Sequence, residues 1–241
     1  MKIILIGYGR MGRLIEQTAV AAGDQVVAAV DIGNIGDLEA MGKIADVVID
    51  FSNPAALPAV AAYVRRTGTA LLSGTTGCTA DDMAVFTELG QYAPVMHSAN
   101  YSVGVAVLRR ALEQVSDVLK PDFDIEIVET HHNQKVDAPS GTAKLLLEAI
   151  DPNGQLTPVY GRQGNCGKRD GKEIGIHALR GGTVAGTHTV HFFGPDEELE
   201  ITHRAASRQI FVNGALQIAH RLYTMPKGSY QLQDVLFSGL E

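Results

Sequence analysis

The sequence predicts an α/β protein whose first half forms a parallel sheet and whose second half adds a smaller α+β domain. In the first half, short apolar runs rich in β-branched residues alternate with Ala- and Leu-rich runs of helical length. The strand-like runs are almost continuously apolar, which indicates a sheet covered on both faces. After Tyr101 this regular alternation ends, and from Gly175 onward strand-like runs follow one another through Gly- and Pro-containing turns.

The first half is expected to alternate strand and helix in strict order. Its strands are predicted at residues 2–6, 25–30, 47–51, 70–73 and 94–97. Its helices are predicted at residues 11–22, 54–67 and 80–89. Because crossover helices make neighbouring strands parallel, the carboxyl ends of these strands should meet at one edge of the sheet.

The second half is expected to hold helices at residues 105–118 and from Ser140 onward, with a strand at residues 125–130 between them. From Gly175 to Val212 the pattern predicts antiparallel strands, at residues 176–180, 187–193 and 198–205. A last helix, at residues 215–222, is expected to return to the first domain. We therefore expect one domain from residues 1–103 and 213–241, and a second from residues 104–212.

Bulk composition excludes several classes of protein. The formal net charge of -7 argues against a nucleic-acid binder, which needs a basic surface to displace phosphate counterions. The apolar start, residues 1–7, is too short for a signal peptide or a membrane span, and no later stretch reaches membrane length. The two cysteines lack metal-ligand spacing. We therefore expect a cytoplasmic protein that binds neither nucleic acid nor membrane.

A glycine-rich loop follows the first predicted strand and precedes the first predicted helix. Its residues, in the spacing GxGxxG, are Gly7, Tyr8, Gly9, Arg10, Met11 and Gly12. In this position the glycines permit a tight turn and a close approach to a pyrophosphate, which the helix N-terminus also favours. The loop predicts a Rossmann-type doubly wound sheet that binds a dinucleotide.

Asp31 ends the second predicted strand, where an acid accepts hydrogen bonds from the adenosine ribose of such a cofactor. The next residue is Ile32 rather than an arginine that grips a 2′-phosphate. This favours NADH, although Arg10 or a distant lysine leaves NADPH open. We expect NADH, NADPH or both as the cofactor.

Three further loops leave the carboxyl ends of predicted strands, where doubly wound sheets bind their ligands. Each is an ordinary polar turn by itself, and the loops become informative only together. Their residues expected at the cofactor are Phe51, Gly74, Thr75, Thr76, Ser98, Ala99, Asn100 and Tyr101.

Residues 129–143 contain the largest group of candidate catalytic and binding residues in the chain. They include a Pro-Ser-Gly-Thr sequence that is typical of a helix start. Ser140 is the expected N-cap of that helix. The backbone N–H groups of Gly141 and Thr142 should then face outward at a positive helix end. This arrangement predicts a seat for a carboxylate.

Basic side chains in the same segment suit proton transfer. Lys135 adds a positive charge or donates a proton, and either His131 or His132 suits a general acid near neutral pH. Taken alone, two adjacent histidines more often form a hydrogen-bonded pair at a strand end. No zinc site is expected, because adjacent strand residues point to opposite faces. His188 and His191 also differ in strand parity and are interpreted as ordinary sheet residues.

Together these motifs closely resemble the dihydrodipicolinate reductase family, over nearly the whole chain. Residues 129–143 resemble the family signature. The other matching segments are GRMG at Gly9, DFS at Asp50, GTTG at Gly74, SANYSVG at Ser98, RGGTVAGTH at Arg180 and EITHRAASR at Glu200. The resemblance implies an NAD(P)H-dependent reductase of 4-hydroxy-tetrahydrodipicolinate. It would form tetrahydrodipicolinate, by way of dihydrodipicolinate, in diaminopimelate and lysine biosynthesis.

The resemblance also implies roles for individual residues. His131 matches the catalytic proton donor or acceptor, and Lys135 matches a second proton donor. The cyclic dicarboxylate substrate would be bound by His132 and by the helix start at Ser140, Gly141 and Thr142. The dinucleotide would lie on the glycine loop, on Asp31 and on the strand-end loops. No metal is implied, and the second domain would bind substrate and build a homotetramer through its sheet.

Two features depart from the common family pattern, and two other functions compete with it. The glycine loop is one residue shorter than usual and residues 32–45 are compact, both near the adenosine end of the cofactor. A different Rossmann dehydrogenase, acting on a semialdehyde or a sugar, would explain the first domain but not residues 131–142. A non-catalytic dinucleotide sensor would need a partner surface or a basic DNA-binding element, and the sequence suggests neither.

Overall fold

The computed structural model describes residues 1–239, and the chain forms two compact units. One unit comprises Met1–Ser102 together with the segment from Gln209 onward, and the other comprises Val103–Arg208. These borders lie within a few residues of those expected at positions 103 and 213. Within the described range, none of the helices is both long and apolar enough for a membrane span.

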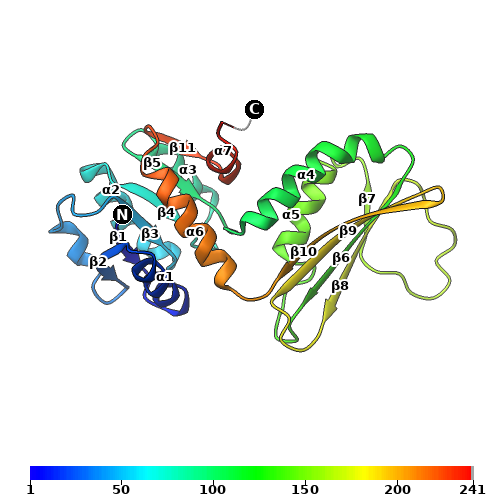
Figure 1. Cartoon of the computed structure of the whole chain (residues 1–241), viewed down its shortest axis with the longest axis horizontal. Helices are drawn as coiled ribbons and strands as arrows, with labels where there is room; N and C mark the ends of the chain where they lie inside the picture. Colours follow the sequence, from blue (N-terminus) through cyan, green and yellow to red (C-terminus); the bar gives the residue numbers. More distant parts are fainter. Residues whose placement is uncertain (240–241) are drawn as a thin grey trace. The chain divides into compact units, whose positions relative to one another are not determined.

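The first unit is built on a six-stranded parallel sheet in the order β11-β5-β4-β3-β1-β2 (Figure 1). Its strands are β1 Lys2–Ile6, β2 Gln25–Val30, β3 Val47–Asp50, β4 Ala70–Ser73, β5 Pro94–His97 and β11 Gly228–Tyr230. The strand order reverses at β1, which pairs with both β2 and β3. Doubly wound sheets bind ligands beyond the strand ends at such a reversal, and the expected fold class is confirmed.

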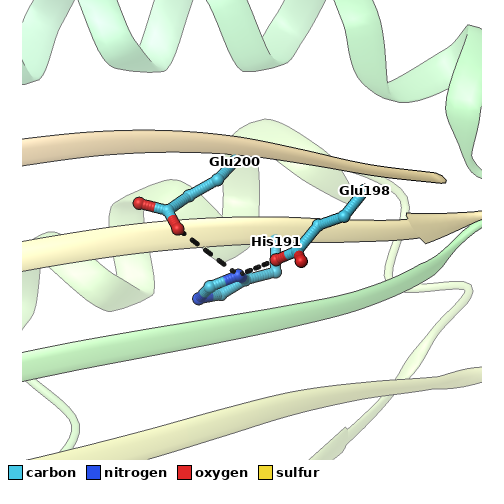
Figure 2. A group of neighbouring side chains, drawn as sticks. All are labelled: His191, Glu198 and Glu200. Atoms are coloured by element: carbon cyan, nitrogen blue, oxygen red, sulfur yellow. Dashed lines mark hydrogen bonds and ion pairs between the residues drawn. The ribbon is translucent and has the colours of Figure 1, made fainter.

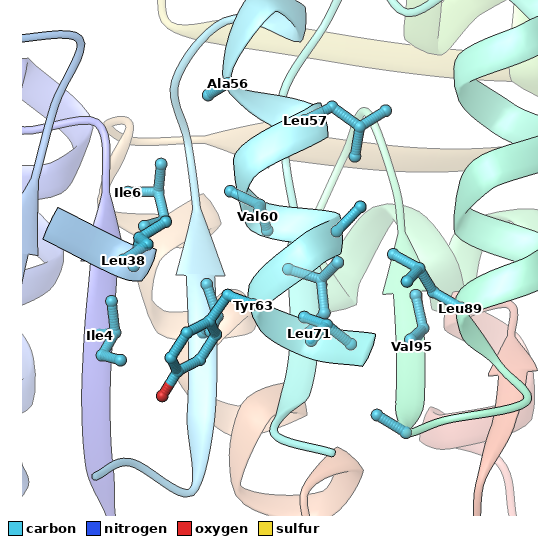
Figure 3. Packing of buried hydrophobic residues seen from close by; sticks show 14 of the residues in the cluster. Ile4, Ile6, Leu38, Ala56, Leu57, Val60, Tyr63, Leu71, Leu89 and Val95 are labelled. Atoms are coloured by element: carbon cyan, nitrogen blue, oxygen red, sulfur yellow. The ribbon is translucent and has the colours of Figure 1, made fainter. Parts of the chain in front are cut away.

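Helices cover both faces of this sheet. They are α1 Arg10–Ala21, α2 Leu57–Thr67, α3 Ala80–Leu89, α6 Gln209–Leu222 and α7 Leu232–Leu236, with short 3₁₀ turns η1 Ile35–Glu39 and η2 Pro54–Ala56. Val60 and Tyr63 of α2 pack in the same buried cluster as Ile4 of the sheet (Figure 3). Ile3 and Leu5 point to the alternate face and are equally buried, on the side of α1 and α6.

Local signals start and stop these helices. The helix α3 begins in a capping box, in which Thr79 Oγ1 accepts from the Asp82 N–H (3.2 Å) and Asp82 Oδ2 accepts from the Thr79 N–H (2.7 Å). The helix α2 ends at Gly68, whose φ of 65° lies in the left-handed region. The single helix expected at residues 54–67 starts instead with the turn η2, where Asn53 caps Ala55.

The second unit packs two helices against one face of a five-stranded sheet, in the order β10-β9-β6-β8-β7 (Figure 1). Its elements are α4 Val103–Leu119, β6 Asp124–His131, α5 Gly141–Ile150, β7 Thr157–Val159, β8 Glu173–Arg180, β9 Gly186–Gly194 and β10 Glu197–Ala205. Ile125 and Ile127 of β6 are buried in one core with α4 and α5. Glu126, between them, points to the other face.

The antiparallel pairing expected from Gly175 onward is partly wrong. The strands β9 and β10 form an antiparallel hairpin, but β8 pairs in parallel with β6 and β7. The reason is that β6 lies between β8 and β9, so consecutive strands are not neighbours. The alternation of apolar and polar residues along a strand indicates which face of the sheet each side chain lies on. It does not indicate which other strand pairs with that strand. The short elements β7, β11 and α7 were also missed, because they are too short for a recognisable period.

Candidate active site

The glycine loop has the backbone geometry of a pyrophosphate site. A Cβ added at Gly7 (φ 88°) would lie 2.6 Å from the carbonyl oxygen of Phe51, and one at Gly12 would lie 2.1 Å from that of Gly7. Gly9 has no such neighbour within 4 Å. Packing therefore requires the first and third glycines, while the second leaves room for a ligand. The first turn of α1 holds neither an acid nor a side-chain cap, so its N–H groups suit an anion.

The remaining loop residues and Asp31 border the same strand ends. The Tyr8 hydroxyl hydrogen-bonds to Glu16 on α1, whereas Arg10 is exposed and Met11 is partly buried. Asp31 follows β2 directly, and its Oδ1 accepts from the Gly33 N–H at 2.9 Å. These residues fit the adenosine and pyrophosphate part of a dinucleotide.

A buried aspartate, which the sequence analysis did not single out, joins the loops after β3 and β4. Asp50 is 2% exposed. Its Oδ1 accepts from the Ser52 N–H (3.1 Å), and its Oδ2 accepts from Ser73 Oγ (2.9 Å) and Thr75 Oγ1 (3.0 Å). The Ser52 N–H also reaches Thr75 Oγ1 at 3.0 Å. One carboxylate thus holds two of the predicted cofactor loops together, with Gly74 partly buried and Thr76 exposed.

The loop after β5 presents its small residues outward and its tyrosine inward. Ser98 Oγ donates to the carbonyl of Asn100 at 2.9 Å, and Ala99 is exposed. Tyr101 is buried, and its hydroxyl donates to the Ser73 carbonyl at 2.7 Å. Burial raises the pKa of Tyr101 well above its ordinary value. The Tyr101 side chain therefore supports a strand end, and the contact of this residue with the cofactor stays a prediction.

In the second unit, a buried carboxylate links the predicted catalytic histidine to two other elements. Glu129 Oε2 accepts from His131 Nδ1 (2.6 Å) and Arg180 Nη1 (2.8 Å). Its Oε1 accepts from Arg180 Nη2 (2.8 Å) and from the Ser140 N–H (3.0 Å). Burial acts to raise the pKa of Glu129, but hydrogen bonds from Arg180, His131 and Ser140 outweigh it and lower the pKa below its usual value. Glu129 is therefore ionised.

Glu129 was not among the predicted site residues, although the alternation along β6 indicates that its side chain is buried. Ile125, Ile127, Glu129 and His131 alternate along β6 and are all buried. A charged residue in register with a buried apolar row must be paired, because an unpaired buried charge is costly. Its partner Arg180 lies 51 positions later, and no local pattern indicates it.

His188 of β9 lies beside the same network. Its Nε2 is 2.9 Å from Ser140 Oγ, and its ring meets that of His131 edge-on with centroids 5.0 Å apart. Burial and the neighbouring His131 lower the pKa of His188 to about 4, so its ring is neutral at pH 7. Strand parity alone predicted an ordinary sheet residue at His188, whereas the structure brings it to Ser140 of the predicted substrate site.

The start of α5 has the predicted capping geometry. Ser140 is the N-cap, and its Oγ accepts from the Ala143 N–H at 3.1 Å. Gly141 is exposed and Thr142 is partly buried in the first turn, which contains no acidic residue. The first turn of α5 therefore suits a carboxylate, as expected.

The loop between β6 and α5 carries the other two predicted residues. The Lys135 N–H donates to the His132 carbonyl at 3.1 Å, which forms a turn. Lys135 Nζ pairs with Asp137 Oδ1 at 2.7 Å, and the Asp137 side chain is 53% exposed. Arg180 Nη2 donates to the Asp137 carbonyl at 2.7 Å. Arg180 thereby ties this loop to β8.

A pocket of about 570 Å³ lies next to this network in the second unit. It is lined by Ala138, Pro139, Lys144, Tyr160, Gly161 and residues 176–179. None of the predicted catalytic or substrate residues lines it.

Within residues 1–239, the side chains of His191, Glu198 and Glu200 form a group with metal-ligand composition (Figure 2). His191 Nδ1 lies 2.7 Å from Glu198 Oε1 and 3.9 Å from Glu200 Oε2. Glu200 is the register partner of His191 on the adjacent strand. His191 points away from the face that buries His188, as their strand parity predicted. Its short contact to Glu198 is that of a cross-strand hydrogen bond.

Known protein families and relatives agree with the resemblance. Residues 1–101 match the family described as "Dihydrodipicolinate reductase, N-terminus", and residues 104–236 match "Dihydrodipicolinate reductase, C-terminus". A 4-hydroxy-tetrahydrodipicolinate reductase from an Exiguobacterium species is 41% identical over 238 residues, covering 98% of this chain and 95% of the relative. One from Clostridium tetani is 39% identical over 250 residues, covering 99% and 98%.

Solved structures share the fold. A dipicolinate-bound dihydrodipicolinate reductase from Paenisporosarcina sp. TG-14 has a TM-score of 0.77 at 20% identity, covering 98% of this chain and 99% of that chain. A DAP dehydrogenase from C. glutamicum, in complex with DAP, has a TM-score of 0.58 at 12% identity, covering 96% and 92%. The chain therefore belongs to the dihydrodipicolinate reductase family, and it is an oxidoreductase.

Proposed function

We propose that this reductase converts 4-hydroxy-tetrahydrodipicolinate, by way of dihydrodipicolinate, to tetrahydrodipicolinate in diaminopimelate and lysine biosynthesis. The observation that carries the proposal is the buried network that joins His131 to Glu129 and to the start of α5. A proton-transferring side chain beside a carboxylate seat suits the reduction of an unsaturated dicarboxylate. The dipicolinate bound by the Paenisporosarcina relative supports a cyclic dicarboxylate as substrate.

The second unit binds and protonates the substrate in this proposal. One substrate carboxylate lies at the first turn of α5, against the N–H groups of Gly141 and Thr142. His132 and Lys135 add donors for the carboxylates and the ring nitrogen. The present partner of Lys135 is the half-exposed Asp137, and such ion pairs contribute little, so the ammonium is free to turn to the substrate. His131 transfers the proton that completes the reduction, and Lys135 serves as a second proton donor.

The first unit binds a pyridine nucleotide. The open N–H groups beside Gly9 suit the pyrophosphate, Asp31 the adenosine ribose, and the loops after β3, β4 and β5 the remainder of the cofactor. A bound nicotinamide supplies the hydride, while the chain supplies orientation and charge. NADH serves at least as well as NADPH, because the carboxylate of Asp31 repels a 2′-phosphate and the exposed Ile32 offers no compensating charge.

The direct test is a spectrophotometric assay of NADH oxidation with freshly prepared 4-hydroxy-tetrahydrodipicolinate. We expect oxidation that depends on this substrate and competitive inhibition by dipicolinate. Matched reactions with a semialdehyde or a sugar should show none. The proposal fails if neither NADH nor NADPH is oxidised with the dicarboxylate, or if one of the control substrates is preferred.

A further inference from the structure

We propose that Glu129 is a positioning residue that holds the imidazole of His131 in one tautomer and one orientation. The inference rests on the proposed function, since Glu129 acts through His131 and not on the substrate. It assigns the buried carboxylate a task beyond stabilising the fold.

The geometry of β6 defines the tautomer. Glu129 and His131 are two residues apart on one strand, so their side chains share a face of the sheet. Glu129 Oε2 lies 2.6 Å from His131 Nδ1. An ionised carboxylate only accepts hydrogen bonds, so Nδ1 carries the proton of the neutral ring. Nε2 is then the nitrogen left to exchange a proton with the substrate.

The surroundings of Nε2 suit that exchange. Gly186 lies beside it at the start of β9, and a Cβ there would approach Nε2 to 3.0 Å. A glycine at this position keeps the nitrogen clear of a neighbouring side chain. His188, which like Gly186 belongs to β9, packs its ring edge-on against that of His131. The imidazole is thus hydrogen-bonded through Nδ1 and packed against His188, and Gly186 places no side chain beside Nε2.

The other hydrogen bonds of Glu129 couple this histidine to the substrate seat. Arg180 donates two N–H groups to the carboxylate, and the Ser140 N–H donates a third. Arg180 also donates to the carbonyl of Asp137, in the loop that carries Lys135. Loss of the charge should therefore disturb proton transfer first, and substrate binding to a smaller extent.

Glu126 provides a matched control on the same strand. It accepts from Arg162 at 2.9 Å through both carboxylate oxygens, and from His177 at 2.7 Å. Burial acts to raise its pKa, but the bonds from Arg162, His177 and Arg169 lower it to about 2. Three positions from Glu129, it faces the opposite side of the sheet. Glu126→Gln therefore removes a comparable arginine-paired carboxylate without contacting His131.

Steady-state kinetics of the full-length chain give the first readout. Glu129→Gln should lower kcat roughly 10²-fold, within the range of a compromised general acid. It should raise KM for the substrate less than it lowers kcat, and leave NADH affinity unchanged. Glu126→Gln should keep kcat within about twofold of the wild type, as expected for an independent site.

The ring nitrogens of His131 give the second readout, which a purely structural role would not move. With ¹⁵N-labelled histidine in alkaline buffer, NMR should show the His131 proton on Nδ1 in the wild type and in Glu126→Gln. In Glu129→Gln the Nε2–H tautomer should appear. The His131 signals are assigned by their loss in His131→Gln.

Two outcomes overturn the inference. One is a wild-type His131 protonated on Nε2, which decides the question even if Glu129→Gln does not fold. The other is a folded Glu129→Gln variant whose kcat matches that of Glu126→Gln. Failure of the proposed function would look different, because the wild type itself would then not reduce the dicarboxylate while the NMR result would still stand.

Discussion

Asp50 and Glu129 bury a carboxylate in the same way, at the end of an apolar strand. Asp50 accepts four hydrogen bonds, two from Ser52 and one each from Ser73 and Thr75. Glu129 also accepts four, two from Arg180 and one each from His131 and Ser140. A buried carboxylate is tolerated only when its oxygens are satisfied in this way. Both side chains thereby hold a strand end, a neighbouring loop and a predicted ligand-binding residue in fixed positions.

The predicted proton donors can be tested by single substitutions. His131→Ala and Lys135→Ala should each lower kcat roughly 10²–10⁴-fold, the usual contribution of a general acid. Neither should unfold the protein, since Lys135 lies in a loop and Glu129 keeps its bonds from Arg180 and Ser140 when His131 is removed. NADH binding should survive in both. Normal turnover at saturating substrate would refute the assignment.

Substitutions of the substrate seat should have a different signature. His132→Ala and Thr142→Ala should act mainly through KM, because they remove ground-state binding of a carboxylate. Lys144→Ala offers a matched control, since this exposed lysine lies on α5 just beyond the first turn. It should leave both kcat and KM near the wild-type values.

For the His131 and Lys135 variants, a combined loss of NADH binding and heat stability would indicate a structural role for these residues instead of a catalytic one.

The cofactor preference is a third prediction at the scale of single residues. Asp31 and Ile32 together disfavour a 2′-phosphate, through repulsion and the lack of an adjacent cation. We expect kcat/KM with NADH to equal or exceed the value with NADPH when both are measured at one ionic strength. A preference for NADPH beyond about tenfold, or roughly 1.4 kcal/mol, would contradict this.

His188 should make stability depend on pH. Its pKa is about 4 in the folded chain and about 6.5 when unfolded, so between these values the unfolded state binds the extra proton. The free energy of unfolding should therefore fall as pH drops from about 6.5 to 4, by about 3 kcal/mol, and then level off. In His188→Gln this part of the pH dependence should disappear. Urea unfolding across the range measures it, and an unchanged slope would disprove the role of His188.

At the scale of elements, Asp50 connects the ends of β3 and β4. Asp50→Asn replaces an acceptor oxygen with an NH₂ group opposite hydroxyl donors, a mismatch that costs about 1–3 kcal/mol when buried. We expect the loops carrying Phe51 and Thr75 to separate, and the Kd for NADH to rise roughly tenfold, or about 1.4 kcal/mol. Fluorescence titration with NADH in the absence of substrate measures this constant.

Asp24→Asn is the control for that experiment. Asp24 is another buried aspartate of the first unit, and it accepts from the Met1 ammonium (2.7 Å) and from His220 (2.9 Å). It precedes β2 and so lies at the amino end of the sheet, away from the predicted cofactor loops. Its substitution should lower stability and leave the Kd for NADH unchanged. Equal losses of NADH affinity in both variants would show that Asp50 acts through stability alone.

For the whole molecule we predict a homotetramer built by the second unit. Both helices of that unit lie on one face of its sheet, and the other face exposes Leu179 and Phe193, 49% and 41% accessible. The strand β7 covers only the first part of β8, which leaves an open edge as well. Exposed apolar faces and open strand edges favour association between copies. Light scattering should give four times the mass of the chain.

Charged substitutions can check the proposed interface. Leu179→Glu and Phe193→Glu together should dissociate the assembly, because both side chains lie on the exposed face. NADH binding by the first unit should persist. A wild type that is monomeric at every concentration, or a tetramer unaffected by the double substitution, would contradict the prediction.

Much of the fold was predictable because its signals are local. The strands β1, β2, β4 and β5 and the helix α3 have the predicted bounds, since each combines an unbroken apolar period with a clear turn or cap. The conformation of the glycine loop and the N-cap at Ser140 depend likewise on residues within a few positions. Local backbone preferences and caps act over one turn or one strand, and the sequence by itself determined them.

Only the tertiary structure decided which distant residues meet. Arg180 reaches Glu129 across 51 positions, and His188 reaches Ser140 across 48. The insertion of β6 between β8 and β9 creates both contacts, and alternation along a strand does not encode the choice of neighbour. The same limit applies to the Tyr101 hydroxyl, which donates to the Ser73 carbonyl 28 positions earlier in the chain. Long-range pairing is selected by the packing of the whole unit, so the residues that contact His131, the predicted catalytic histidine, come together only when the chain is folded.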